Sequence, residues 1–83
     1  MKVQGEYVLT EIGDETIACS VGAGRPRVVT LNETGVVLWH LLEEGSTQDR
    51  LFEALHEQFE VSEEKARADV AIFIETLQSH GII

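Results

Sequence analysis

The chain has 83 residues and a formal net charge of −9, with 43% hydrophobic and 25% charged residues. A chain of this size buries about 60 to 65% of the surface of its unfolded form, which is enough for one core and leaves no room for a cleft between domains. The apolar fraction is ordinary for a globular protein and excludes wholesale disorder. The excess of acidic over basic side chains argues against a surface that binds phosphate groups, since nucleic-acid affinity depends on clustered Lys and Arg.

Compartment signals in the sequence are consistent with one another. No run approaches the ~18 apolar residues of a membrane span, and the N-terminal segment lacks the apolar centre of a signal peptide. The single Cys19 cannot form an internal disulfide, which fits a reducing compartment. We therefore expect a cytoplasmic protein that does not cross a membrane.

Charge and periodicity both divide the chain near residue 31. Residues 1–31 hold three basic and four acidic side chains, whereas residues 32–83 hold three basic and eleven acidic ones. The first part has the alternation of strands and the second the period of helices, without a Pro- or Ser-rich linker, a repeat or a low-complexity tract between them. The sequence predicts a single α+β domain over residues 1–83.

Three strands are expected, at about residues 6–12, 15–20 and 27–31. Gly13 and the residue after it form a two-residue turn that joins the first two strands as a hairpin. A glycine-rich loop over residues 21–24 then leads to a proline at position 26. A proline at the start of a strand suits a sheet edge, where its missing N–H leaves no ladder bond unmade. The third strand is therefore a candidate edge strand.

Three helices are expected, at about residues 33–44, 47–59 and 63–80. Asn32 is placed to cap the first helix, and Gly45 ends it. This helix is apolar nearly all round, which is typical of a helix buried on most sides. Its tryptophan is more typical of a core residue than of a ligand contact.

Capping residues also mark the ends of the other two helices. Ser46, with Asp49 three residues later, resembles a capping box for the second helix. Ser62 is placed to cap the third helix, and Gly81 lies where a left-handed residue ends it. These signals separate the second and third helices by a short connection.

The third helix has an additional row of side chains beside its core face. The core row is Ala66, Val70, Phe73, Ile74 and Leu77. The additional row, at about 60° from Phe73 by the count of 100° per residue, is Lys65, Asp69, Ile72 and Thr76. Ile72 either lines a groove or is a residue at the rim of the core.

Catalytic and metal-binding patterns are absent from the sequence. Cys19 has no recognisable base, so a core thiol is the better interpretation than a nucleophile. The three histidines lack the spacing of a zinc site, and the glycine-rich loop lacks the Lys-Ser/Thr of a phosphate loop. We expect no enzyme, no cofactor and no metal.

Several short motifs follow one another over residues 28–83. They are LNETG at 31–35, LLEEG at 41–45, FEV at 59–61 and ADV at 68–70. In this order the combination resembles the PqqD-like family, named for coenzyme PQQ synthesis protein D. Residues 6–27 match that family in strand pattern only.

The resemblance implies a fold and a function. The implied fold is a winged helix-turn-helix-like domain, in which a three-stranded antiparallel sheet packs on three helices. The implied function is that of a RiPP recognition element, a peptide chaperone that captures the leader of a ribosomally synthesised precursor peptide. The leader adds as a strand to the third strand, beside the third helix, and is presented to a modifying enzyme in trans, often a radical SAM protein. The family serves the biosynthesis of PQQ and of several classes of peptide natural product.

Strand addition predicts a set of peptide-binding residues. They are Arg25, Arg27, Val28, Val29, Thr30, Leu31, Asp69, Ile72, Phe73 and Thr76. Main-chain groups of Val28, Val29 and Thr30 are expected to pair with the peptide. Alternation places the side chains of Arg27, Val29 and Leu31 towards the helices, and those of Val28 and Thr30 on the other face.

Two arginines form a local basic spot in this acidic chain. Arg25 and Arg27 either meet an acidic residue of the leader or only relieve the negative charge near the sheet. The two interpretations stay open at this point.

Other classes of function remain alternatives. One is a structural subunit that docks permanently on a partner enzyme through the same edge strand. Another is a winged-helix regulator that binds DNA with its third helix, but residues 63–75 carry two basic and four acidic side chains, which phosphate would repel. An exposed edge strand can also pair with its own copy, which would give a homodimer.

Overall fold

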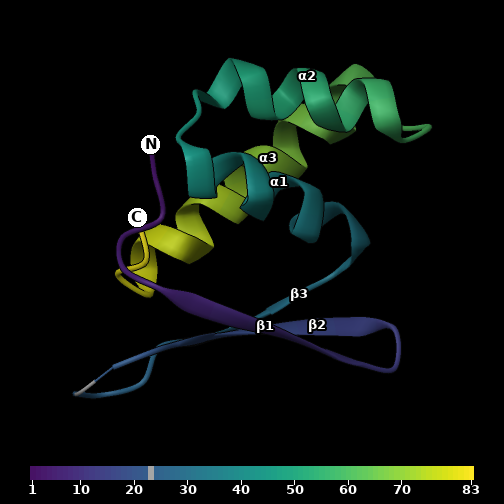
Figure 1. Cartoon of the computed structure of the whole chain (residues 1–83). Coiled ribbons are helices and arrows are strands. Elements are labelled where there is room, and N and C mark those ends of the chain that lie inside the picture. Colours follow the sequence, from purple (N-terminus) through teal and green to yellow (C-terminus); the bar gives the residue numbers. More distant parts are fainter. Residues whose placement is uncertain (23) are drawn as a thin grey trace.

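The computed structural model describes residues 1–22 and 24–83 of the chain. Three helices lie on one face of a three-stranded antiparallel sheet (Figure 1). This arrangement confirms the α+β, winged helix-turn-helix-like fold that the sequence predicts. Of the glycine-rich loop expected over residues 21–24, position 23 lies outside the described residues.

The sheet is formed by β1 (Tyr7–Ile12), β2 (Glu15–Ser20) and β3 (Val28–Leu31), in the order β1-β2-β3. The first and third strands begin one residue later than the sequence predicts. Gly13 joins β1 to β2 with a φ of +64°, which a glycine adopts at no steric cost. β3 is an edge strand, as predicted, and β1 forms the other edge.

The helical layer consists of α1 (Glu33–Glu44), α2 (Gln48–Gln58) and α3 (Glu63–Ser79). α1 packs against the sheet, and α2 lies on the side of α1 and α3 that is away from the sheet (Figure 1). Gly45 ends α1 with a φ of +98°, and Gly81 follows α3 with a φ of +72°. Both helix ends therefore follow the glycine signals in the sequence.

The second helix is capped by a different residue from the one predicted. Thr47, not Ser46, is the cap: its Oγ1 accepts a hydrogen bond from the Arg50 N–H at 3.2 Å. The main chain of Ser46 is engaged elsewhere, because its N–H donates to the carbonyl oxygen of Met1 at 2.8 Å. This bond to a distant segment moves the helix start one residue along the chain.

The cap of α1 matches the prediction. Asn32 Oδ1 accepts hydrogen bonds from the Gly35 N–H at 2.8 Å and from the Thr34 hydroxyl at 2.9 Å. One side chain thus satisfies a main-chain donor of the first turn and orders a neighbouring hydroxyl. α3 is capped in the same way, with Ser62 Oγ accepting from the Lys65 N–H at 3.2 Å.

Replacing Asn32 by Ala is expected to destabilise the domain by about 1 kcal/mol, because the cap bond is lost. In a domain of this size that corresponds to a fall of about 4 to 8 °C in the Tm. Thermal unfolding followed by circular dichroism measures the effect. Asn32→Asp, which keeps the cap acceptor, is the control and should stay close to the native Tm. Equal Tm values for the native chain and Asn32→Ala would contradict this role.

The core is centred on Trp39, whose side chain is fully buried, as the sequence predicts. The rings of Trp39 and Tyr7 meet edge to face, with their centroids 5.1 Å apart. Other fully buried side chains around it come from all three helices and the C-terminal segment: Leu42, Leu51, Leu55, Leu77 and Ile82. Trp39 therefore joins β1 to the helical layer.

The N-terminal segment before β1 is ordered by contacts that the sequence pattern does not reveal. Val3 is 8% exposed, and its N–H donates to the Leu42 carbonyl oxygen at 2.9 Å. The Gln4 N–H donates to the carbonyl oxygen of Ile82, also at 2.9 Å. The two ends of the chain consequently lie side by side, next to the end of α1 (Figure 1).

Candidate functional site

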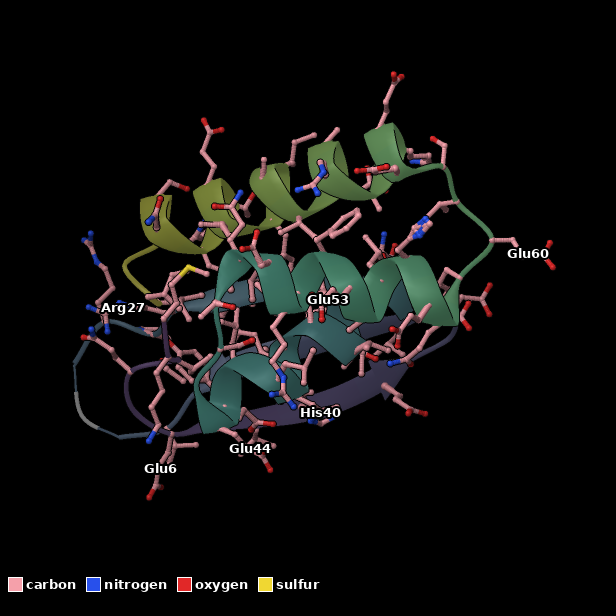
Figure 2. All side chains as sticks on the ribbon, turned by 90° about the horizontal axis from the view of Figure 1, so that it is seen from above. Glu6, Arg27, His40, Glu44, Glu53 and Glu60 are labelled. Carbon is pink, nitrogen blue, oxygen red and sulfur yellow. The ribbon has the colours of Figure 1, made fainter. Side chains whose placement is uncertain are left out.

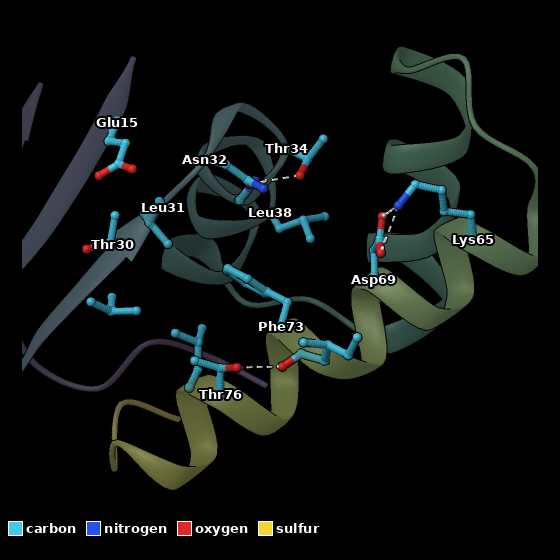
Figure 3. A pocket seen from close by; sticks show the side chains of 14 residues that line it. Glu15, Thr30, Leu31, Asn32, Thr34, Leu38, Lys65, Asp69, Phe73 and Thr76 are labelled. Atoms are coloured by element: carbon cyan, nitrogen blue, oxygen red, sulfur yellow. Dashed lines mark hydrogen bonds and ion pairs between the residues drawn. The ribbon is translucent and has the colours of Figure 1, made fainter. Parts of the chain in front are cut away.

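A groove of about 390 Å³ runs between β3, the start of α1 and the side of α3 (Figure 3). The residues that line it are Glu15, Val29, Thr30, Leu31, Asn32, Thr34, Gly35, Leu38, Lys65, Asp69, Ile72, Phe73, Thr76 and Leu77. Seven of the ten predicted site residues are among them: Val29, Thr30, Leu31, Asp69, Ile72, Phe73 and Thr76. The structure brings the edge strand and the additional row of α3 together in one concave surface.

The middle of the groove is apolar. Leu31 is almost fully buried in its floor, Phe73 is half-buried, and Ile72 is 62% exposed at its rim. Of the two interpretations of Ile72, the structure supports the groove. Phe73, which the sequence places in the core row, is only partly in the core and presents part of its ring to the groove.

Gly35 in the first turn of α1 allows the groove floor to close. A Cβ at this position would lie 3.5 Å from Leu31 Cβ, 3.5 Å from Phe73 Cε1 and 3.1 Å from Asn32 Oδ1. A glycine costs a helix about 0.5 to 1 kcal/mol relative to alanine. Here the close approach of β3 and α3 to the helix start explains that cost.

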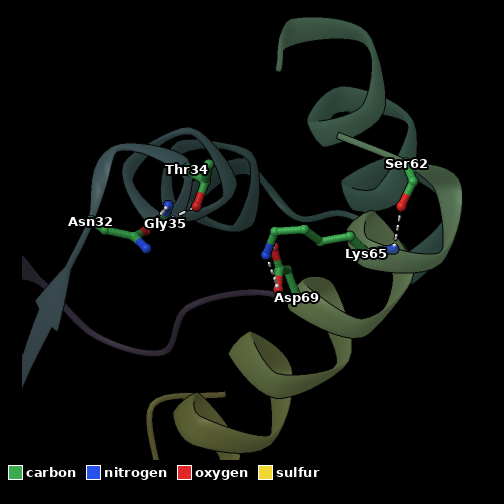
Figure 4. A network of polar contacts seen from close by, with 6 residues as sticks. All are labelled: Asn32, Thr34, Gly35, Ser62, Lys65 and Asp69. Atoms are coloured by element: carbon green, nitrogen blue, oxygen red, sulfur yellow. Dashed lines mark hydrogen bonds and ion pairs between the residues drawn. The ribbon is translucent and has the colours of Figure 1, made fainter. Parts of the chain in front are cut away.

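One end of the groove is polar (Figure 4). Lys65 Nζ and Asp69 Oδ2 form an ion pair at 3.0 Å, and their side chains are 62% and 35% exposed. A pair this exposed contributes less than about 1 kcal/mol, so both side chains are free to turn to a ligand. The Thr76 hydroxyl, by contrast, is held within α3, because it donates to the Ile72 carbonyl oxygen at 2.8 Å.

The hydrogen bonds between β2 and β3 determine which main-chain groups of β3 face the free edge. The Ser20 N–H donates to the Arg27 carbonyl oxygen at 2.9 Å, so these two residues form a hydrogen-bonded pair. In an antiparallel ladder such pairs alternate, and the register continues them at Val29. The N–H and C=O groups of Val28 and Thr30 therefore point to the free edge. The expectation that main-chain groups of Val29 also face the edge is wrong, since they pair with β2.

Side chains of β3 alternate as predicted. Val29 and Leu31 are 8% and 2% exposed and face the helices, whereas Val28 is 47% exposed on the other face. Val29 thus belongs to the groove through its side chain and not through its main chain. Thr30 contributes its free main-chain groups at the groove edge, while its exposed side chain lies on the other face of the sheet with that of Val28.

The remaining three predicted residues, Arg25, Arg27 and Val28, line a separate hollow at the end of α3. Arg27 lies against the turn that ends this helix: a Cβ on Gly81 would be 3.4 Å from Arg27 Nε. Because α3 has no basic residue in its last turn, Arg27 supplies a cation near the negative end of the helix dipole.

The two arginines have no ion-pair partner within residues 1–22 and 24–83. The labelled acids of the helical layer, Glu44, Glu53 and Glu60, lie away from Arg27 (Figure 2). The structure therefore places a free cationic group beside one end of β3, and it also gives Arg27 a structural role at the end of α3.

Sequence reasoning missed several groove residues, among them Lys65, Glu15 and Gly35. Lys65 could have been found, because it belongs to the same helical row as Asp69. Glu15 could not have been found, because its place beside the groove follows from the β2–β3 register, in which Thr16 pairs with Leu31 and Glu15 lies one position further. The contribution of Gly35 depends on how α1 packs on Phe73, and no local pattern carries that information.

The described part of the chain lacks two features that would indicate other functions. It contains no group of three or more His, Cys, Asp or Glu side chains that could hold a metal ion. None of its helices combines the length and the apolar character that crossing a membrane requires.

Comparison with family models gives a match to coenzyme PQQ synthesis protein D (PqqD) over residues 6–83. The chain belongs to the PqqD family. The match confirms the resemblance carried by residues 28–83 and extends it through the two strands that matched only in pattern. Comparison with curated proteins gives no match for this PqqD-family chain.

Comparison with solved structures finds TbiB1 in complex with the TbiA(beta) leader peptide. The TM-score is 0.75 at 24% sequence identity, and the alignment covers 99% of this chain and 93% of TbiB1. The two proteins share the fold over almost their whole length.

Proposed function

We propose that this PqqD-family chain is a non-catalytic module that captures the leader of a ribosomally synthesised precursor peptide. The leader adds as a fourth strand to β3 and lies in the groove between β3 and α3. The observation that carries the proposal is that the free N–H and C=O groups of Val28 and Thr30 border an apolar groove. The presence of a leader peptide in the complex of TbiB1, which has the same fold, supports it.

Affinity and specificity come from different parts of the site. Main-chain hydrogen bonds at the strand edge can form with any extended peptide, so they give affinity that does not depend on the peptide sequence. Leader side chains opposite Val29 and Leu31 point towards the helices, since directly opposite residues of a ladder share a face. Two leader residues that are two positions apart therefore enter the groove, where Ile72 and Phe73 favour apolar side chains.

The edge of β3 is better suited to a peptide than the edge of β1. Each hollow includes three charged side chains: Lys2, Glu6 and Glu43 beside β1, and Glu15, Lys65 and Asp69 beside β3, so the difference between the two edges lies in their apolar residues. The groove beside β3 has Leu31, Ile72 and Phe73 at its centre. This difference favours strand addition at β3.

The captured leader is then presented to a modifying enzyme in trans, for which a radical SAM protein is one candidate class. The competing proposal is a structural subunit that docks permanently on an enzyme through the same edge. The two differ in one measurable property: a permanent subunit has no affinity for any free leader peptide.

Isothermal titration of the purified domain with the leader of the precursor encoded beside its gene tests the proposal. Replacing Ile72 by Lys is expected to lower leader affinity by about tenfold, or 1.4 kcal/mol, because a cation replaces exposed apolar surface at the groove rim. The fold should be unaffected, since the side chain is mostly exposed.

Ala71→Lys is the matched control for this variant, because Ala71 is the exposed neighbour on α3 and does not line the groove. It should bind the leader as the native chain does. A native chain that binds no leader would favour the structural subunit. Equal affinities for Ile72→Lys and Ala71→Lys would exclude the groove.

The free arginines at the end of β3 give a second prediction. Changing Arg25 and Arg27 together to Ala should lower the affinity of the domain for an acidic leader about three- to tenfold in low salt. The reason is that an exposed charge-assisted contact contributes about 1 kcal/mol. The loss should shrink as salt is raised. Unchanged affinity with a lower Tm would instead show that the pair only stabilises the end of α3.

A further inference from the structure

The face of the sheet that points away from the helices is mostly uncharged and is not covered by a helix. Strand alternation places on it Glu15, beside Ile12 at the hairpin end, and seven uncharged residues: Val8, Thr10, Ile12, Ile17, Cys19, Val28 and Thr30. Val8, Ile12 and Val28 are 54%, 60% and 47% exposed. No helix lies on this side of the sheet in Figure 1. We call these seven residues the outer face.

The outer face ends at the strand edge proposed to bind the leader. Its cross-strand rows are Val8–Cys19–Val28 and Thr10–Ile17–Thr30, and both end on β3. Leader residues opposite Val28 and Thr30 would place their side chains on this same face, because opposite residues share a face. A bound leader strand would therefore continue both rows by one residue each.

We propose that the outer face and the outward-facing side chains of the bound leader form one composite surface, on which the modifying enzyme docks. This inference rests on the proposed function, because the leader strand completes the surface. The leader is then held by its groove-facing residues and recognised by the enzyme through the alternate ones.

The size of the outer face favours a transient partner over a second copy of the chain. Three strands spaced 4.8 Å apart and about 20 Å long offer a footprint of about 300 Å², whereas a stable interface buries about 800 Å² per partner. A second copy would also bring another net charge of −9. An enzyme that must release its product needs a short-lived contact, and the leader strand widens the footprint by about a third.

Charges at the two ends of the sheet define the chemistry of the partner. The hairpin end carries Glu11, Asp14 and Glu15, all exposed, and the other end carries Arg25 and Arg27 with one exposed acid, Glu6, so it stays net positive. The β1–β2 turn and the loop before β3 lie at opposite ends of the sheet (Figure 1). The fitting enzyme surface is an apolar patch with basic side chains where it meets the hairpin and acidic ones where it meets the loop.

A composite surface couples the two binding events. If the enzyme contacts the leader as well as the domain, it binds the loaded domain more tightly than the free one. By linkage, the enzyme then raises the affinity of the domain for the leader by the same factor.

The test uses the full chain, the leader peptide and the purified modifying enzyme encoded beside the gene. Val8→Lys places a cation in the outer face on β1, two strands away from the leader, and Ala71→Lys places one on an exposed position of α3. We expect Val8→Lys to weaken enzyme binding at least tenfold and to bind the leader as the native chain does. Ala71→Lys should leave both affinities within twofold, and the loaded native domain should bind the enzyme at least fivefold more tightly than the free one.

Several outcomes would overturn the inference. They are equal enzyme affinities for Val8→Lys and Ala71→Lys, equal enzyme affinities of free and loaded domain, or a native dimer that Val8→Lys dissociates while enzyme binding persists. Should Val8→Lys not fold, Thr10→Lys, exposed on the same face, replaces it. Leader titration without the enzyme tests the proposed function by itself, so the failure of one proposal is distinguishable from that of the other.

A scan of the leader provides a second, independent arm. Substituting alternate leader residues by Asp should divide them into two sets. One set should lower the affinity for the domain, and the other should leave that affinity unchanged but weaken recruitment of the enzyme. If every sensitive leader position changed only the affinity for the domain, and none changed recruitment of the enzyme alone, the proposal of a composite surface would be overturned.

Discussion

Replacing Thr30 by Pro is expected to abolish most of the leader affinity while the domain stays folded. The Thr30 N–H faces the free edge of β3, so its loss removes no bond of the native sheet. The proline ring removes one donor for the incoming strand and obstructs its approach. We expect at least a tenfold loss of affinity, or about 1.4 kcal/mol, in isothermal titration with the leader peptide.

Two further variants isolate the main-chain effect. Thr30→Val keeps the N–H and a β-branched side chain, and should bind the leader within about twofold of the native chain. Val29→Pro removes a donor that pairs with β2 together with a buried side chain, and should lower stability by about 3 kcal/mol. If the folded Thr30→Pro variant bound the leader normally, strand addition at this edge would be excluded.

Replacing Trp39 by Ala is expected to cause the largest loss of stability in the molecule. The side chain is fully buried and meets the Tyr7 ring edge to face. Removing a buried aromatic side chain costs about 3 to 5 kcal/mol, mainly because the cavity left behind does not close. A domain of this size has a total stability of about 5 to 10 kcal/mol, so the variant should lose a large fraction of its stability and unfold at a clearly lower urea concentration.

Urea unfolding followed by far-UV circular dichroism measures this loss without relying on tryptophan fluorescence. Trp39→Phe is the control, since it keeps an aromatic ring against Tyr7, and it should lose at most about half as much. The indole N–H of Trp39 and the hydroxyl of Tyr7 have no hydrogen-bond partner in the described part of the chain. Phe at position 39 removes one of these unpaired groups, which partly offsets the lost volume. A cost below about 1 kcal/mol for Trp39→Ala would contradict the central role of this residue.

The elements of the fold could be predicted because their signals are local. Alternation and Gly13 indicate the hairpin, and Asn32, Gly45 and Gly81 mark helix ends by backbone and capping chemistry. The start of α2 could not be predicted to the residue, because Ser46 and Thr47 are equally able to cap a helix. The choice between them depends on a bond from Ser46 to Met1, 45 residues away.

The side chains that line the site could be predicted from the sequence, but the main-chain groups that are free to bind a peptide could be predicted only in part. Helical and strand periods place Ile72 on the additional row of α3 and Val29 on the inner side of β3. Which N–H groups of β3 are free depends on the hydrogen-bond register with β2, and a shift by one residue would reverse the answer. The Ser20–Arg27 bond fixes that register, and no local pattern contains it.

The side-by-side chain ends have a consequence for covalent assembly. Val3 and Ile82 lie near the end of α1, whereas Asn32, Thr34 and Gly35 line the groove at the start of this helix, about 18 Å away by the rise of 1.5 Å per residue. The other end of the groove reaches Leu77, whose carbonyl oxygen accepts from the Ile82 N–H at 2.9 Å, so a tether attached at the chain ends would leave open the end of the groove at the start of α1. Linking a second protein there would turn its encounter with the loaded domain into an intramolecular event, at an effective concentration set by the tether length.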